Sequence, residues 1–192
     1  MEILDVLDEN GNYTGIKEER KKIHEQGLYH MHVGVWIMNE KGEILLEQRA
    51  SNKKVDPNKW ARIGGHVDAG EKPIQAIQRE ILEEIGVKIP LENFIVLETD
   101  KSDVYDSNKK IYNRYFSRSY FAFVGYKIEE YNIQKEEVKA LKYITIEEMI
   151  KAKEERKKEY VFTKWNTFDR HIKLLKKQRE KILELELSLI HI

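Results

Sequence analysis

Residues 65–87 read GHVDAGEKPIQAIQREILEEIGV, and this stretch decides the fold. Pro73 suits the first turn of a helix, where a backbone N–H is not needed. Apolar residues then recur every three or four positions, at Ile74, Ile77, Ile81 and Ile85. This spacing places one apolar stripe along a helix that faces a core, and Gly86 is a typical stop. The sequence therefore predicts an amphipathic helix between two loops.

The surrounding sequence predicts strands on both sides of this helix. Alternating residues around the turn Glu9-Asn10-Gly11 predict a hairpin over 2–16, followed by a short helix over 17–25. β-Branched and aliphatic runs predict further strands at 30–39, 43–49, 60–67, 93–98, 111–124 and 138–144. A short helix is expected from Ile146. A long helix should follow, with an apolar stripe at Val161, Trp165, Phe168, Ile172 and Leu175.

Three carboxylates lie at i, i+3 and i+4 on the isoleucine-striped helix: Glu80, Glu83 and Glu84. Their side chains share one patch of the helix surface, where like charges repel. A divalent cation among them would offset that repulsion, and hard oxygen ligands favour Mg²⁺, with Mn²⁺ as the alternative, over zinc. The residues taken alone leave a second interpretation open, which is a solvated acidic face.

The register of the whole stretch resembles the box of the Nudix (MutT-like) hydrolase family. Gly65, five residues, Glu71, seven residues and the run from Arg79 to Val87 meet every specified position of that pattern. The resemblance implies that Glu80, Glu83 and Glu84 bind metal together with the backbone carbonyl of Gly65. It also implies that Glu71 and Arg79 pair to brace the loop against the helix.

The resemblance implies a fold as well. Nudix proteins form an α/β/α sandwich around a mixed β-sheet, and the likeness covers residues 28–150. We expect residues 1–27 to add an N-terminal hairpin and a short helix. Residues 151–192 should add a basic C-terminal helical extension, since 151–181 holds twelve Lys or Arg against five Asp or Glu. A solvated helix face is the expected role of this charge, with contact to a substrate or partner as the alternative.

A Nudix hydrolase also needs a general base and positive groups for the phosphates. Glu83 is our first choice for the base, with Glu84 and the pair Glu136 and Glu137 as alternatives. Arg49 and Arg62 are the leading phosphate-binding candidates because arginine binds phosphate oxygens through two donors, and Lys59 and Lys54 follow. His66, which follows Gly65, is expected to make a structural hydrogen bond, with metal or phosphate contact as the alternative.

Composition limits the classes of function. The 192 residues carry 34 basic and 34 acidic side chains, so no overall field attracts a nucleic-acid polymer. The absence of cysteine excludes disulfides, thiolate zinc sites and a cysteine nucleophile, and it agrees with a cytoplasmic location. No membrane span or leader is expected. The apolar stripe of the last helix predicts either a homodimer or cover for the chain's own sheet.

These observations predict a Mg²⁺-dependent hydrolase that cleaves a diphosphate linkage, in a nucleoside diphosphate derivative or a similar small diphosphate, with metal-activated water. Two alternatives stand beside it. One is activity like that of isopentenyl-diphosphate isomerases, a Nudix branch that the run from Glu47 to Glu71 resembles; it is disfavoured because the isomerase cysteine is missing. The other is a non-catalytic Nudix binding or regulatory module.

Overall fold

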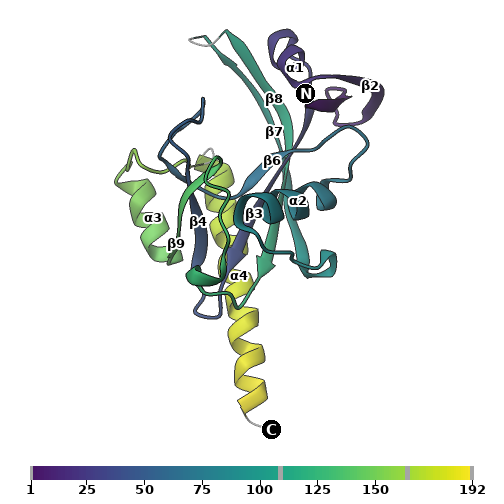
Figure 1. Ribbon diagram of the computed structural model, residues 1–192. Coiled ribbons are helices and arrows are strands. Elements are labelled where there is room, and N and C mark those ends of the chain that lie inside the picture. Colours follow the sequence, from purple (N-terminus) through teal and green to yellow (C-terminus); the bar gives the residue numbers. More distant parts are fainter. Residues whose placement is uncertain (1, 108–109, 163–164, 191–192) are drawn as a thin grey trace. The chain divides into compact units, whose positions relative to one another are not determined.

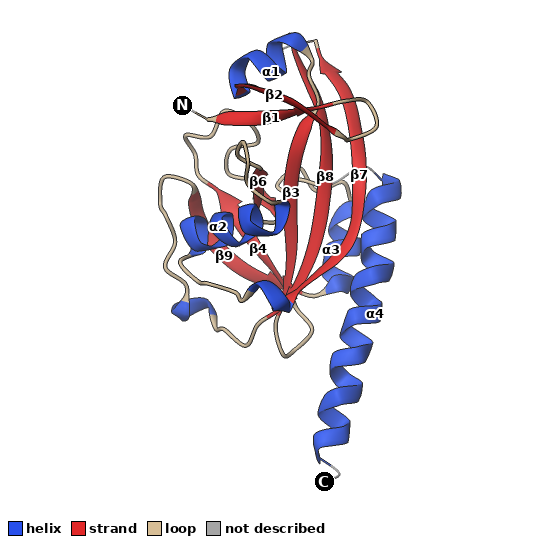
Figure 2. Ribbon diagram, turned by 90° about the vertical axis from the view of Figure 1, so that its right-hand side faces the viewer, coloured by secondary structure: helices blue, strands red, loops and turns tan. Residues whose placement is uncertain are grey.

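The computed structural model describes residues 2–107, 110–162 and 165–190, with side chains of the last helix described for 167–182 and 184. Its strands are β1 (Ile3–Leu7), β2 (Tyr13–Glu19), β3 (His30–Met38), β4 (Ile44–Arg49), β5 (Trp60–Ala61), β6 (Gly64–His66), β7 (Phe94–Asp106), β8 (Ile111–Phe123) and β9 (Val138–Ile144). Its α-helices are α1 (Arg20–Gln26), α2 (Pro73–Ile85), α3 (Ile146–Glu154) and α4 (Trp165–Ile190), with short 3-10 turns at Leu91–Asn93 and Ile128–Glu130 (Figures 1 and 2).

The chain divides into two compact units, which we describe separately. Unit 1 comprises Met1–Val35, Ile63–Leu82 and Lys88–Tyr120; unit 2 comprises Trp36–Arg62, Glu83–Val87 and Phe121–Ile192. Strand β3, helix α2 and strand β8 each run from one unit into the other. The strands form a two-stranded sheet, β1-β2, and a larger sheet of order β5-β4-β3-β8-β7, in which β6 also pairs with β3 and β9 with β4.

Unit 1 is built from hairpins and from the first part of α2. The predicted N-terminal hairpin is present as β1 and β2, and Leu4 and Val6 pack with Ile23 of α1 in a small core. Strand β2 continues to Glu19, so α1 begins three residues later than predicted. Strands β7 and β8 run side by side as a long hairpin (Figures 1 and 2), and β7 extends well beyond the predicted 93–98.

Unit 2 centres on β4, which is paired with its neighbours on both edges. It pairs antiparallel with β9 from Ile44↔Ile144 onward and with β5 through Glu47↔Ala61. The predicted single strand over 60–67 is therefore wrong: β5 pairs with β4 in this unit, while β6 belongs to unit 1 and pairs with β3. Two residues separate these strands, and the partner of each is set by long-range pairing.

The two C-terminal helices of unit 2 follow local sequence signals. Thr145 accepts a hydrogen bond from the Glu148 backbone N–H and returns one to the Glu148 carboxylate, a capping box that stabilises the start of α3 by ~1 kcal/mol. In α4, Phe168, Ile172 and Leu175 are buried as the stripe predicts. Val161 precedes the helix and is exposed, so its place in the stripe was wrong; the Trp165 side chain lies outside the described residues.

The predicted α/β class is confirmed, with its central mixed sheet, N-terminal hairpin and long C-terminal helix. Among the helices of the described residues, none combines the length and the apolarity needed to cross a bilayer.

Candidate active site

Helix α2 holds its glutamates in a fixed orientation because its isoleucines bury one side of the helix. Ile77, Ile81 and Ile85 are fully buried, which at roughly 1.5–3 kcal/mol each holds the helix in one rotation about its axis. Gly86 ends the helix with a φ of 73°, a conformation that glycine adopts without strain. A Cβ there would also approach the Asn132 backbone oxygen to 2.7 Å. The helix bounds predicted from sequence are therefore confirmed.

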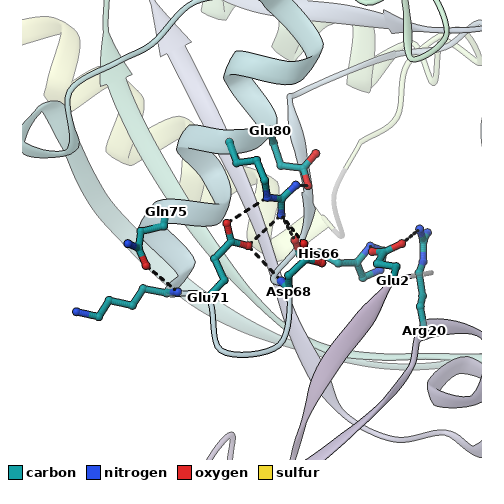
Figure 3. A network of polar contacts seen from close by, with 9 residues as sticks. Glu2, Arg20, His66, Asp68, Glu71, Gln75 and Glu80 are labelled. Carbon is teal, nitrogen blue, oxygen red and sulfur yellow. Dashed lines mark hydrogen bonds and ion pairs between the residues drawn. The ribbon is translucent and has the colours of Figure 1, made fainter.

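A bidentate ion pair joins Arg79 to Glu71 across the loop that precedes α2 (Figure 3). Arg79 Nε and Nη2 donate to the two Glu71 oxygens at 3.1 and 3.0 Å, and Nη2 also donates to the His66 carbonyl at 3.1 Å. Burial works against the charge of Arg79, but the Glu71 and Glu80 carboxylates outweigh it and raise the pKa of the guanidinium. The structure thus brings the two predicted bracing residues together.

Glu80 lies against the backbone of Gly65. A Cβ on Gly65 would overlap the Glu80 carboxyl group, so only glycine permits this approach. Arg79 Nη1 donates to Glu80 Oε1 at 2.8 Å and holds the carboxylate there (Figure 3). Strand β6 sets the position of Gly65 through its antiparallel pairing with Val33 of β3. Two of the predicted metal-binding positions, Gly65 and Glu80, are therefore neighbours within unit 1.

Glu84 and Glu83 lie at the end of α2 in unit 2 and differ in exposure. Glu84 is 7% exposed, whereas Glu83 is exposed. The Glu84 backbone carbonyl accepts a hydrogen bond from the Gln134 N–H at 3.0 Å, and the Gln134 carbonyl accepts one from the Glu137 N–H at 2.9 Å. Backbone hydrogen bonds thus connect the segment that carries Glu137 to the C-terminal end of α2. A general base supplied by this later segment would need such a position.

Glu137 forms an ion pair with Lys53, a residue of the loop after β4. Its backbone carbonyl also accepts a hydrogen bond from Ala50 N–H at 2.9 Å. The neighbouring Glu136 is exposed. Glu137 is consequently the better placed of the two alternatives, although a lysine holds its carboxylate in this conformation.

The predicted phosphate-binding cations all have local partners in unit 2. Arg49 Nε donates to the Val55 carbonyl at 3.0 Å, and Lys59 pairs with Asp56 at 2.6 Å. Both contacts shape the loop between β4 and β5. The Arg62 guanidinium lies over the Trp36 ring, 5.5 Å from its centroid. Each cation therefore has a structural contact, and Arg49 and Lys59 are backbone neighbours, since the Arg49 N–H donates to the Lys59 carbonyl at 2.9 Å.

Sequence reasoning missed the N-terminal hairpin as part of this region. The Glu2 carboxylate accepts from Arg20 at 2.8 Å and lies 3.3 Å from His66 Nδ1 (Figure 3). Burial raises the pKa of Glu2, but the hydrogen bonds from His66 and Arg20 outweigh it and lower that pKa to about 2. The only signal in the sequence was the unusual density of histidine between residues 24 and 66.

A NUDIX domain family model matches residues 28–165. The chain belongs to the Nudix family. Among curated relatives, Nudix hydrolase 3 of Arabidopsis thaliana is 35% identical over 77% of this chain. The matched region is only 20% of the length of that protein. An uncharacterized Nudix hydrolase of Listeria monocytogenes is 31% identical, over 78% of this chain and 83% of its own.

Two further comparisons bear on the branch and the fold. An isopentenyl-diphosphate Delta-isomerase of Streptomyces avermitilis is 36% identical, over 44% of each chain. A crystal structure from Deinococcus radiodurans superposes with a TM-score of 0.65 at 18% identity, over 92% of this chain and 98% of that one, so the two proteins share a fold. These comparisons confirm the predicted family and the prediction of a Nudix-type hydrolase.

Proposed function

We propose that this Nudix protein is a Mg²⁺-dependent hydrolase that cleaves the diphosphate linkage of a nucleoside diphosphate derivative or a similar small diphosphate. The observation that carries the proposal is the contact between the Glu80 carboxylate and Gly65, held by Arg79. A Cβ at position 65 would overlap the Glu80 carboxyl group, so glycine is needed for this contact. A carboxylate and a backbone carbonyl are the kinds of oxygen ligand that Mg²⁺ prefers, which supports a divalent cation beside Glu80 and Gly65.

Glu80, Glu83, Glu84 and the Gly65 carbonyl would hold the cation, with Mn²⁺ as an alternative ion. The helix register places the three carboxylates on one patch, and burial of Glu84 suits a carboxylate that binds metal. A cation held by these residues would supply positive charge to stabilise the diphosphate in the transition state and would lower the pKa of a nearby water. Glu71 and Arg79 fix the loop and the helix relative to each other, so they act on position rather than on chemistry.

The remaining roles follow from charge and reach. Glu83, which is exposed, accepts the proton of the attacking water, with Glu84 and Glu137 as the alternatives. Arg49, Arg62 and Lys59 hold phosphate oxygens, which requires the guanidinium of Arg49 and the ammonium of Lys59 to add substrate contacts to their present ones. The proposal also includes a cytoplasmic location and a homodimer formed through the apolar stripe of α4, with cover for the chain's own sheet as the alternative role of that stripe. It divides the chain into an N-terminal segment, 1–27, the Nudix domain, 28–150, and a C-terminal extension, 151–192.

A substrate panel tests the proposal directly. The full chain is incubated with Mg²⁺, Mn²⁺ or a chelator and with nucleoside di- and triphosphates, nucleotide sugars, dinucleotides and isopentenyl diphosphate, and products are separated chromatographically. We expect metal-dependent cleavage between two phosphorus atoms for at least one compound. Isomerised isopentenyl diphosphate without phosphate release, or no product from any compound, would overturn the hydrolase assignment.

A further inference from the structure

Four of the six histidines of the chain lie in unit 1, on three different elements. His24 belongs to α1, His30 and His32 to β3, and His66 to β6. The His30 and His66 rings stack with centroids 5.1 Å apart, and His24 meets them edge-on at 5.1 and 5.8 Å. One nitrogen from each of these three rings lies within 4.8 Å of the other two. The three imidazoles therefore face a common point.

Two of these rings have the outer partners that orient histidine ligands. His24 Nδ1 lies 2.9 Å from the Tyr112 carbonyl oxygen, which only accepts, so Nδ1 carries the proton and Nε2 keeps its lone pair. His66 Nδ1 lies 3.3 Å from the Glu2 carboxylate, which sets the same tautomer. Metal-binding histidines usually donate their second nitrogen to a carbonyl or carboxylate in this way.

The environment of His30 is not explained by simple packing of histidine rings in a core. The residue is fully buried, and neither ring nitrogen has a hydrogen-bond partner among the described residues. A buried polar atom left without a partner costs about 1–3 kcal/mol. A neutral imidazole keeps a lone pair on one ring nitrogen, so His30 can offer one nitrogen to a metal.

We propose that His24, His30 and His66 bind a transition-metal ion, zinc in preference to magnesium, at a site distinct from the glutamates of α2. Three neutral imidazoles suit zinc and leave a fourth position open to water or another ligand. Tetrahedral zinc with bonds of about 2.0–2.1 Å places its nitrogens roughly 3.3 Å apart, so the rings would turn inward slightly on binding. Glu2 orients His66 from outside and is a positioning residue.

The site has a structural consequence that does not depend on the proposed function. His66 follows Gly65 on β6, and its carbonyl accepts a hydrogen bond from Arg79. A bound ion would therefore fix α1, β3 and β6 to one another and hold the strand that carries Gly65. His32 serves as an internal comparison, because it lies on the same strand but its Nδ1 meets Ser117 Oγ at 3.3 Å and it is not part of the three-histidine group.

Zinc binding by the full chain tests the proposal. Protein stripped with a chelator is equilibrated with Zn²⁺ in excess Mg²⁺, which occupies the carboxylates, and bound zinc is measured by mass spectrometry and by competition with a chromogenic chelator. We expect one Zn²⁺ per chain. His24→Gln should lose tight binding, and Glu2→Gln should weaken it by roughly 10–100-fold. His32→Gln and Glu80→Gln should bind as the wild type does.

Several results would overturn the site. These are a wild-type chain that binds no zinc, a His24→Gln variant that binds it normally, and loss of zinc from Glu80→Gln, which would place the ion among the glutamates of α2. Thermal melts without metal show whether each variant is folded. Glu2→Gln keeps the test decisive if His24→Gln unfolds, since unchanged affinity in it contradicts the proposed orientation of His66. Cobalt substitution gives a second readout, with intense visible bands expected for a tetrahedral site.

Discussion

Replacing Arg79 with lysine is predicted to lower both stability and activity. The hydrogen bonds of Arg79 include two to Glu71, one to Glu80 and one to the His66 carbonyl. Lysine keeps the charge but lacks the planar fork, so about two charge-assisted bonds are lost at roughly 1.5–3 kcal/mol each. The Arg79 side chain is 28% exposed, and water partly replaces the lost bonds. We therefore expect a loss of ~2–4 kcal/mol in the free energy of unfolding.

This loss corresponds to a fall in Tm of about 5–15 °C for a chain of this size, measured by circular dichroism. Since Glu80 also loses its partner, kcat should fall by roughly 100-fold on whichever diphosphate the panel identifies. Arg114→Lys is the matched control, because the Arg114–Asp103 pair is exposed to water and should contribute little to stability. An Arg79→Lys variant as stable and active as the Arg114→Lys control would refute the bracing role.

Three further predictions concern Gly65, Phe168 and Glu2. Gly65→Ala should displace the flexible Glu80 carboxyl and reduce kcat by about 100-fold with little change in Tm; equal activity would show that Glu80 does not need this position. Phe168→Ala empties a buried site under the Lys153 ammonium and should cost ~3–5 kcal/mol in urea unfolding, which an unchanged midpoint would contradict. Because the pKa of folded Glu2 lies near 2, below its ordinary 4.5, its carboxylate stabilises the fold above that ordinary value and loses this effect as pH falls toward 2. The stability gap between wild type and Glu2→Gln, from urea titrations across acidic pH, should therefore narrow on acidification, and a constant gap would refute the linkage.

Helix α2 could be predicted from the sequence because its boundaries and its buried face depend on residues within the helix itself. Pro73 and Gly86 mark the two ends of α2, and the isoleucine stripe gives its buried face. The spacing between Gly65 and Glu80 predicted their partnership only through a family resemblance, since fourteen residues of chain lie between them. The structure adds the physical reason, which is the absence of a side chain at Gly65.

Long-range pairing explains what the sequence did not predict. Strands β5 and β6 are two residues apart but pair with different strands, and no local pattern distinguishes their partners. The contact between Glu2 and His66 joins residues 64 positions apart, and the three-histidine group combines α1, β3 and β6. The sequence shows four histidines between residues 24 and 66. That three of them lie together depends on the register of β6 against β3, which the sequence alone does not give.

The most direct test of the account compares metal-dependent hydrolysis by wild type and Glu80→Gln. Glutamine preserves the shape of the side chain and removes the charge that the proposed cation requires. We expect the Glu80→Gln variant to keep the Tm of the wild type while its kcat/KM falls by roughly 100–1,000-fold at saturating Mg²⁺. Activity equal to that of wild type in a folded Glu80→Gln variant would contradict the claim that this carboxylate, seated on Gly65, holds the catalytic metal.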